Sequence, residues 1–355
     1  MVDVTVRADL AVRGVRVAAP VVRSKGAGPT DDGHVVVDGL PMALPLASDS
    51  PWSIVDGLLF HDEDPVDGLG LVAPVERPRF YDVTTPEGVP YERLARLHGD
   101  RVLATTVVQT CIRYADEATR CRFCSIEESL AAGSTTRVKT PAELAAVAEA
   151  AVRLDGVTQL VMTSGTSAAA DRGARYLARC AAAVHEAVPH LPIQVQCEPP
   201  EDPATSFREL RDAGVTAIGI HVESLDEAVR RRWTPGKAEV SLAEYEAAWI
   251  EAVAVFGWNR VSTYVLVGLG EDPDELVAAC EHLIGLGVYP FVVPFRPIDG
   301  TLAVRDGAEA PPADLLVHVT GRVGALLAAA GMAGSDQGAG CAACGACSAL
   351  STVGG

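Results

Sequence analysis

The stretch IQVQCEPPEDPATSFRELRDAGVTAIGIHVES, residues 193–224, has two runs of branched aliphatic residues on either side of a polar, helix-like segment. The runs at 193–197 and 216–222 predict strands. Residues 203–213 predict a helix that ends at Gly214. A strand, a helix and a second strand at this spacing indicate a β/α/β unit with parallel strands.

The same alternation runs through the chain from about residue 102. We expect strands at residues 102–109, 158–163, 193–197, 216–222, 261–267 and 289–293. We expect helices at residues 141–154, 172–188, 203–213, 242–256 and 272–286, and Thr140 heads a capping sequence, TPAE. Six β/α units predict an α/β fold with a parallel sheet, closed wholly or partly into a TIM-type barrel. The pattern alone does not separate a partial barrel from an open doubly wound sheet.

Polar and apolar residues alternate along the two strands of the opening stretch. Gln194, Gln196 and Glu198 share one face of the first strand, and His221 and Glu223 share one face of the second. Strands of an ordinary parallel sheet are apolar on both faces. The polar faces therefore predict the lining of a central cavity. The alternatives are a solvent-exposed face and a set of satisfied polar groups in the core.

The chain divides into three regions. Residues 1–100 predict a small β-containing extension, with a hairpin around Asp38 and Gly39 and a short helix within 85–100. Residues 101–310 predict the barrel of about six units. Residues 311–355 predict a C-terminal helix and a cysteine-rich tail.

Composition excludes several functional classes. The net charge of −18 repels phosphate backbones, so we do not expect binding to long nucleic acid. Hydrophobic residues make up 48% of the 355 residues, enough for a large core. The chain has no apolar run long enough for a membrane span, and its first ten residues do not read as a signal peptide. We therefore expect a cytoplasmic protein without a membrane partner.

Three of the nine cysteines lie in the loop after the first expected strand: Cys111, Cys121 and Cys124. Cytosolic thiols stay reduced, so clustered cysteines indicate metal binding or chemistry rather than disulfides. Three soft thiolates suit an iron–sulfur cluster with one open iron. A structural zinc site requires a fourth ligand, which this loop lacks.

The second group lies in a Gly- and Ala-rich tail: Cys341, Cys344 and Cys347. Its spacing resembles a ferredoxin-type run, and the nearby glycines permit tight turns. We expect a second [4Fe-4S] cluster here. The three cysteines do not decide what its fourth ligand is. The alternatives are a zinc knot that borrows a ligand and a tail without metal. Cys180, Cys197 and Cys280 are expected to be buried small hydrophobes.

Four segments in order resemble the radical SAM superfamily, over about residues 102–301. CRFC (121–124) resembles the end of its cluster-binding loop. VMTSGTSA (161–168) resembles the segment that holds the amino group of S-adenosylmethionine. GIHVESLDEAVRR (219–231) resembles its ribose- and carboxylate-contacting segment, and YVLVGLGED (264–272) its adenine-supporting glycine motif. The pattern is most similar to the branch of biotin synthase, thiazole-tyrosine lyase and hydrogenase maturase. More narrowly, it resembles the family encoded beside a nitrilase in bacterial gene clusters linked to cyanide assimilation.

The resemblance implies that the first three cysteines hold a [4Fe-4S] cluster that binds S-adenosylmethionine. It implies these cofactor-binding residues: Phe123, Ser164, Gly165, Thr166, Glu223, Ser224, Arg231, Val267 and Gly268. An arginine that binds the carboxylate in related enzymes has no counterpart at its usual place, so we assign that role to Arg231, Arg232 or Lys237. Nine residues separate the first two cysteines where most members have three, and this longer loop is expected to bring Arg113 or Tyr114 over the site.

The resemblance also implies an activity, the reductive cleavage of S-adenosylmethionine to a 5′-deoxyadenosyl radical. The radical would remove hydrogen from a small polar metabolite, with flavodoxin or ferredoxin as reductant. We expect these residues to orient that substrate: Gln194, Gln196, Glu198, His221 and Arg296. For His221 the alternative is a satisfied core histidine, and for Arg296 a structural ion pair. The alternative reaction is sulfur insertion with the tail cluster as sulfur donor, and a remote alternative is a non-catalytic iron–sulfur carrier.

Overall fold

The central sheet of the protein, taken from a computed structural model that describes residues 2–17 and 34–353, has seven strands. Six are parallel and follow one another in chain order: β9 (Val102–Thr106), β10 (Gln159–Thr163), β11 (Ile193–Gln196), β12 (Ala217–Gly219), β13 (Val261–Val267) and β14 (Val288–Pro294). The seventh, β8 (Arg96–His98), pairs antiparallel with β9. All six expected strands are present.

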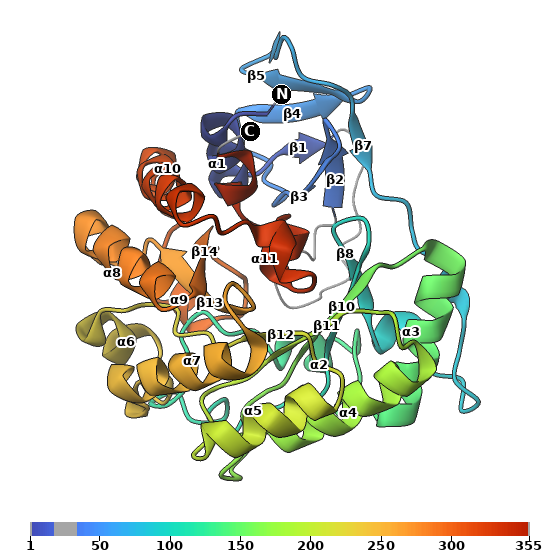
Figure 1. Ribbon diagram of the computed structural model, residues 1–355. Coiled ribbons are helices and arrows are strands. Elements are labelled where there is room, and N and C mark those ends of the chain that lie inside the picture. Colours follow the sequence, from blue (N-terminus) through green and yellow to red (C-terminus); the bar gives the residue numbers. More distant parts are fainter. Residues whose placement is uncertain (1, 18–33, 354–355) are drawn as a thin grey trace.

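The sheet curls into half of a barrel (Figure 1). Its edges are β8 and β14, which do not pair with each other in the described part of the chain. The expected partial barrel of parallel strands is therefore confirmed. The expected short helix within residues 85–100 is wrong beyond the 3₁₀ turn Tyr91–Arg93. Arg96–His98 forms an edge strand instead because it pairs with β9.

Helices cover the outer face of the half-barrel (Figure 1). They are α3 (Pro141–Asp155), α4 (Ala174–Ala187), α5 (Pro203–Asp212), α7 (Leu242–Phe256), α8 (Pro273–Gly285) and α10 (Ala313–Ala329), with the short α2 (Glu128–Ala131), α6 (Glu227–Trp233) and α9 (Leu302–Arg305) in the loops. Thr140 caps α3 in the expected capping box with Glu143. Among the described residues, none of the helices combines the length and apolarity that a membrane span requires.

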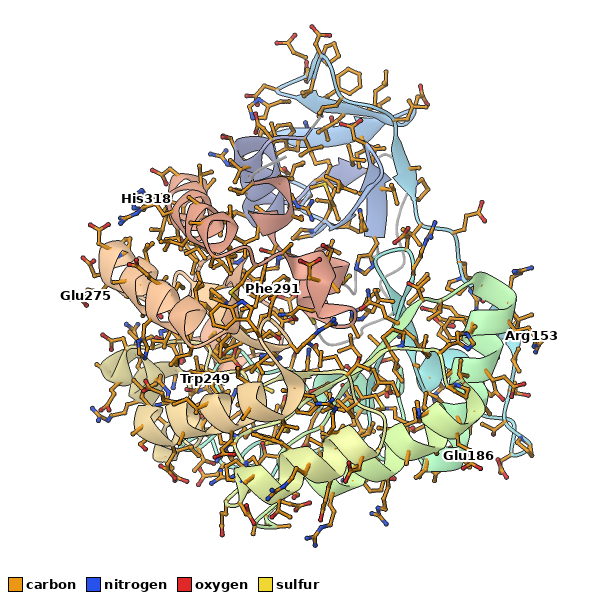
Figure 2. The ribbon with its side chains drawn as sticks, in the orientation of Figure 1. Arg153, Glu186, Trp249, Glu275, Phe291 and His318 are labelled. Carbon is orange, nitrogen blue, oxygen red and sulfur yellow. The ribbon has the colours of Figure 1, made fainter. Side chains whose placement is uncertain are left out.

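The core lies between the sheet and these helices. Trp249 of α7 is 2% exposed and donates to the Ile220 carbonyl (Figure 2). Phe291 of β14, also 2% exposed, lies on the inner face of the sheet with its partner Tyr264 (Figure 2). Charged and polar side chains project from the opposite helix faces (Figure 2): Arg153, Glu186, Glu275 and His318. Each helix thus buries one apolar stripe against the sheet, as the sequence periodicity predicts.

The N-terminal part adds α1 (Val4–Arg13) and two small sheets. One contains β1 (Arg16–Val17), β4 (Trp52–Val55), β5 (Leu58–His61) and β6 (Asp64–Pro65), and the other contains β3 (Leu40–Ala43), β2 (His34–Val37) and β7 (Val72–Pro74). The expected hairpin is formed by β2 and β3, and Asp38 and Gly39 at its turn both have positive φ. Helix α1 packs on α10. The sequence analysis did not identify α1.

The cysteine-rich tail returns to the barrel, where α11 (Cys341–Cys344) lies between the edges β14 and β8 (Figure 1). The Gly340 N–H donates to Oε1 of Gln159, the first residue of β10. Arg260, which precedes β13, donates to the Gln337 carbonyl at 2.6 Å. The tail therefore enters the half-barrel from the amino ends of its strands.

Candidate active site

A cavity of about 430 Å³ lies at the carboxyl ends of the strands. Thr106 of β9, Thr163 of β10, Gln196 of β11 and Pro294 of β14 contribute to its wall. The carboxyl ends of parallel β/α barrels carry the active site because the βα loops converge there. The three cysteines of the first loop line this cavity: Cys111, Cys121 and Cys124.

The cysteine loop turns tightly around this cavity. The Cys124 N–H donates to the Cys121 carbonyl at 3.0 Å, and the Tyr114 N–H donates to the Cys111 carbonyl at the same distance. Burial, with a smaller effect of Cys111, raises the pKa of the Cys124 thiol to about 11. Such a thiol ionises when a cationic metal centre takes its sulfur as ligand.

The spacing of the sulfurs also bears on the kind of metal centre. Among the described residues, no three His, Cys, Asp or Glu side chains converge on a point where they would share one metal ion. Cys111, Cys121 and Cys124 all line one cavity, and three soft thiolates suit an iron–sulfur cluster.

Arg113, from the nine-residue insert, is buried and donates to both carboxylate oxygens of Glu198, just beyond β11. Glu198 also accepts from Thr166 Oγ1 at 2.7 Å and faces Arg172 at 3.4 Å. Although burial opposes its ionisation, Lys237 and Arg113 hold the pKa of Glu198 below its ordinary value. The pair anchors the insert to Glu198, which lines the cavity, although Arg113 itself does not line it. Tyr114 instead donates to Glu128 at 2.9 Å.

Glu223 lies at the carboxyl end of β12 with a φ of +68°, a left-handed conformation that non-glycine residues seldom adopt. Its backbone is fixed by hydrogen bonds to Tyr264 and Leu266 of β13. Its carboxylate is 2.7 Å from Lys237 Nζ, and both side chains are largely buried. Burial opposes the charge of Lys237, but Glu223 holds its pKa above the ordinary value. Strained backbone of this kind is concentrated at functional sites.

His221 presents one ring nitrogen to the cavity interior. Its Nδ1 accepts from the Tyr264 N–H at 3.1 Å, which assigns the proton to Nε2. Nε2 is buried and has no hydrogen-bond partner in the described part of the protein. Burial, followed by the charge of Lys237, lowers the pKa of His221 well below its ordinary value. The ring is therefore a neutral N–H donor that has no acceptor among the described residues.

Most of the predicted site residues lie together in this cavity. Besides the three cysteines these are Phe123, Ser164, Gly165, Thr166, Gln196, Glu198, His221, Glu223 and Arg296. The polar strand faces read from the sequence thus point into the half-barrel. Gln194 lies deeper on the same face, where it donates to Ser262 Oγ at 3.3 Å.

Four predicted cofactor-binding residues do not line the cavity. Arg231 lies on the exposed face of α6 and pairs with Glu227, so its expected role at the site is wrong. Lys237, named with it, reaches the site instead. The Ser224 hydroxyl turns away and accepts from the Asp226 N–H. Val267 is buried outside the cavity, and Gly268 packs against Pro311.

The error at Val267 follows from strand parity. Gly219 faces the cavity beside His221 and pairs with Ser262, so the inward positions of β13 are Ser262, Tyr264 and Leu266. Tyr264 and Leu266 do line the cavity. The period-two pattern, applied to this strand, would have identified both and excluded Val267.

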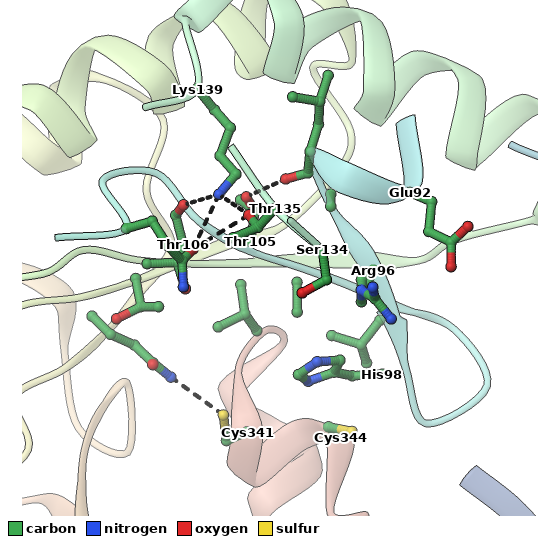
Figure 3. Close-up of a pocket in the computed structure, with 18 of the residues that line it drawn as sticks. Glu92, Arg96, His98, Thr105, Thr106, Ser134, Thr135, Lys139, Cys341 and Cys344 are labelled. Carbon is green, nitrogen blue, oxygen red and sulfur yellow. Dashed lines mark hydrogen bonds between the residues drawn. The ribbon is translucent and has the colours of Figure 1, made fainter. Parts of the chain in front are cut away.

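The tail cysteines line a second cavity, of about 230 Å³ (Figure 3): Cys341, Cys344 and Cys347. Gln196 Nε2 lies 3.2 Å from Cys341 Sγ. Burial raises the pKa of Cys347, while Arg296 and Arg7 oppose that rise. Gln196, Tyr264 and Cys347 border both cavities, so the two cysteine groups face one interior from opposite ends of the strands.

One curated protein is similar to about half of this chain. A lipoyl synthase from Chlamydia felis is 28% identical over 171 residues, which cover 48% of this chain and 52% of that protein. The chain therefore matches about half the length of this relative.

Solved structures are also similar to this chain, at lower identity. The hydrogenase maturase HydG has a TM-score of 0.47 and 15% identity, over 65% of this chain and 51% of that chain. Methylornithine synthase has a TM-score of 0.47 and 16% identity, over 71% and 78%. A radical SAM methyltransferase from Sphaerobacter thermophilus has a TM-score of 0.48 and 18% identity, over 67% and 66%.

The family comparison covers the part of the barrel from β10 to β13. Residues 118–283 match the family model described as the Radical SAM superfamily. This segment includes Cys121, Cys124, Ser164 and Glu223, all of which line the carboxyl-end cavity. Over residues 118–283 the chain is therefore similar to the enzymes of the radical SAM superfamily.

Proposed function

We propose that the protein abstracts hydrogen from a small polar metabolite held between two iron–sulfur clusters. Cys111, Cys121 and Cys124 would hold the first [4Fe-4S] cluster. When reduced, such a cluster cleaves S-adenosylmethionine to methionine and a 5′-deoxyadenosyl radical. The tail cysteines would hold the second cluster.

The residues around the first cysteine group suit the bound S-adenosylmethionine. Glu223 is the candidate acceptor for the ribose hydroxyls, because it lines the cavity and its carboxylate is held in place by Lys237. Lys237 is also the remaining cation for the carboxylate of the methionine part. The loop from Ser164 to Thr166 also lines the cavity, and it suits the amino group.

One observation carries the two-cluster proposal: Gln196, Tyr264 and Cys347 border both cysteine-lined cavities. A substrate between the groups would meet the amide of Gln196, the Nε2–H of His221 and the guanidinium of Arg296, and these groups favour a small polar molecule. Glu198 is engaged by Arg113, so its proposed role is to position the cluster loop rather than the substrate.

Sulfur insertion is the second candidate. It is favoured by the position of the tail cysteines, which line the same interior as the radical-generating group, and by the likeness to a lipoyl synthase. Loss of one tail cluster for each product would support it, and an intact cluster after many turnovers would contradict it. A flavodoxin- or ferredoxin-like reductant and a gene next to a nitrilase remain parts of the proposal.

The experiment uses the full chain, reconstituted anaerobically with iron and sulfide and reduced with dithionite. Added S-adenosylmethionine should yield 5′-deoxyadenosine and methionine in equal amounts. Fractions of a bacterial metabolite extract prepared in deuterated medium should then include one that accelerates this reaction and transfers deuterium into 5′-deoxyadenosine. The absence of any 5′-deoxyadenosine from a protein that binds iron would contradict the proposal.

A further inference from the structure

Two histidines from the N-terminal hundred residues line the tail cavity beside the three cysteines: His34 of β2 and His98 of β8. Their rings are 5.7 Å apart and tilted by 39°. Neither residue lies in the barrel-spanning segments that carry the family resemblance. Both reach the tail cysteines because β2 and β8 pack beside the tail.

His98 faces the interior of the half-barrel next to Cys344. It pairs with Val102 across β8 and β9, and cross-strand partners project to the same face of a sheet. The next residue, Gly99, has a φ of +58°, and a Cβ atom there would lie 3.2 Å from Cys344 Sγ. Figure 3 shows the His98 ring beside Cys341 and Cys344.

His34 approaches the same cysteines from another sheet. Its partner in the hairpin is Ala43, whose N–H donates at 3.0 Å to the carbonyl of Ala346, between Cys344 and Cys347. The side chain of His34 is 9% exposed, and its Nε2 is buried without a hydrogen-bond partner among the described residues. A buried nitrogen without a partner indicates that the cavity holds a further group.

We propose that the tail cluster has a nitrogen ligand, supplied by His98, which completes a Cys₃His set while the His34 ring packs behind it. This inference rests on the proposed second cluster and names its fourth ligand. Imidazole nitrogen binds iron well, and replacing thiolate by histidine in an iron–sulfur cluster raises its reduction potential because a negative ligand becomes neutral.

Two arginines near the tail cysteines are also expected to raise the reduction potential of the cluster. Arg7 is 2% exposed and donates to the Gly345 carbonyl at 2.6 Å, and Arg296 donates to the Ala43 carbonyl at 3.2 Å. Both cations interact electrostatically with Cys347. A cluster with one neutral ligand and two neighbouring cations would accept an electron more easily than one with four thiolates.

The test isolates the tail site in the full chain. Cys111, Cys121 and Cys124 are replaced by alanine, so that the tail holds the only cluster and S-adenosylmethionine has no iron to bind. The protein is produced with histidine labelled by ¹⁵N, reconstituted anaerobically, reduced and studied by pulsed EPR. We expect a strong nitrogen coupling that changes with the label. It should disappear in His98→Ala and persist in His34→Ala.

His98→Cys serves as the second variant. It should retain the iron, lose the labelled coupling and shift the reduction potential of the tail cluster to a more negative value. Retained iron in this variant also separates loss of a ligand from loss of the fold.

The outcomes distinguish the two proposals. If the isolated tail binds no iron, or binds only zinc, the second cluster itself is wrong. If it binds a four-iron cluster without any label-dependent coupling, the cluster stands and the histidine ligand is refuted. If the coupling disappears in His34→Ala and persists in His98→Ala, the assignment of His98 is refuted.

Discussion

Glu223 combines a strained backbone conformation with a side chain that lies in the candidate active site. The turn after β12 places it at a φ of +68°, where β13 holds its backbone and Lys237 its carboxylate. The residue type and its place at a strand end were readable from the sequence. The left-handed conformation was not, because it depends on hydrogen bonds to a strand about forty residues away.

Glu223→Gln is the first prediction. We expect binding of S-adenosylmethionine to weaken by about 1.5–3 kcal/mol, the range for a hydrogen bond to a charged group. Isothermal titration of the reconstituted protein measures this change. Glu227→Gln is the matched control, because that carboxylate pairs with Arg231 on the exposed face of α6. Equal affinities of Glu223→Gln and the unsubstituted protein would contradict the assignment.

At the scale of elements, the insert between the first two cysteines is fixed at two points. Arg113 meets Glu198 inside the protein, and Glu117 meets Arg305 on the surface at 2.6 Å. A buried pair cannot lose one partner without leaving an uncompensated charge, whereas an exposed pair contributes little. Variants of the two pairs can therefore be compared to separate the effect of losing a buried ion pair from the effect of losing a surface charge.

Arg113→Ala is the second prediction. The variant should leave Glu198 without its main partner and loosen the cysteine loop. We expect the first cluster to be lost, so that total iron falls by about half, and proteolysis within residues 112–120 to become faster. Arg305→Ala should keep both its iron and its resistance to protease. Identical behaviour of the two variants would show that the buried pair does not position the loop.

Strand and helix positions followed from sequence to within a few residues, because burial on one or both faces imposes a period on the residues. The edge strand β8 was missed since its three residues, Arg96–His98, are half-buried and carry no such period. Val267 was misplaced for a different reason. A motif resemblance assigned it, whereas the parity of β13 points Leu266 into the cavity.

At the scale of the whole molecule, the site combines segments that lie far apart in the chain. The tail cavity unites β2, β8, β9 and the tail cysteines at residues 341–347. Sequence spacing identified the two cysteine groups, because each lies within one loop. It did not identify His34 or His98, since only the packing of the N-terminal sheets on the tail brings them to the cysteines.

The third prediction concerns the number of clusters. Reconstituted protein should bind about eight irons, in two four-iron clusters. Replacing Cys111, Cys121 and Cys124 by alanine should leave about half the iron and abolish cleavage of S-adenosylmethionine. Iron and sulfide assays with Mössbauer spectroscopy measure this directly. Unchanged iron content in the variant would refute the first cluster site.

The fourth prediction separates radical generation from the complete reaction. Replacing Cys341, Cys344 and Cys347 by alanine should leave the first cluster intact, because its cysteines and the proposed S-adenosylmethionine-binding residues lie at the carboxyl ends of the strands while the tail enters from the amino ends. We expect 5′-deoxyadenosine to form with dithionite while conversion of the substrate is lost. The control is Cys280→Ala, a cysteine buried in α8 away from both cavities.

Folding has to be checked before these rates are compared, because the tail fills the gap between the edge strands and its metal would contribute to stability. Circular dichroism and four retained irons would show that the barrel is intact. Full substrate conversion by such a variant would mean that the tail cysteines take no part in the reaction. Loss of all 5′-deoxyadenosine formation from a folded variant with four irons would make them part of the radical-generating site itself. Because the two cavities share Gln196 and Tyr264, the structure favours the remaining outcome, in which the tail acts on the substrate after the radical has formed.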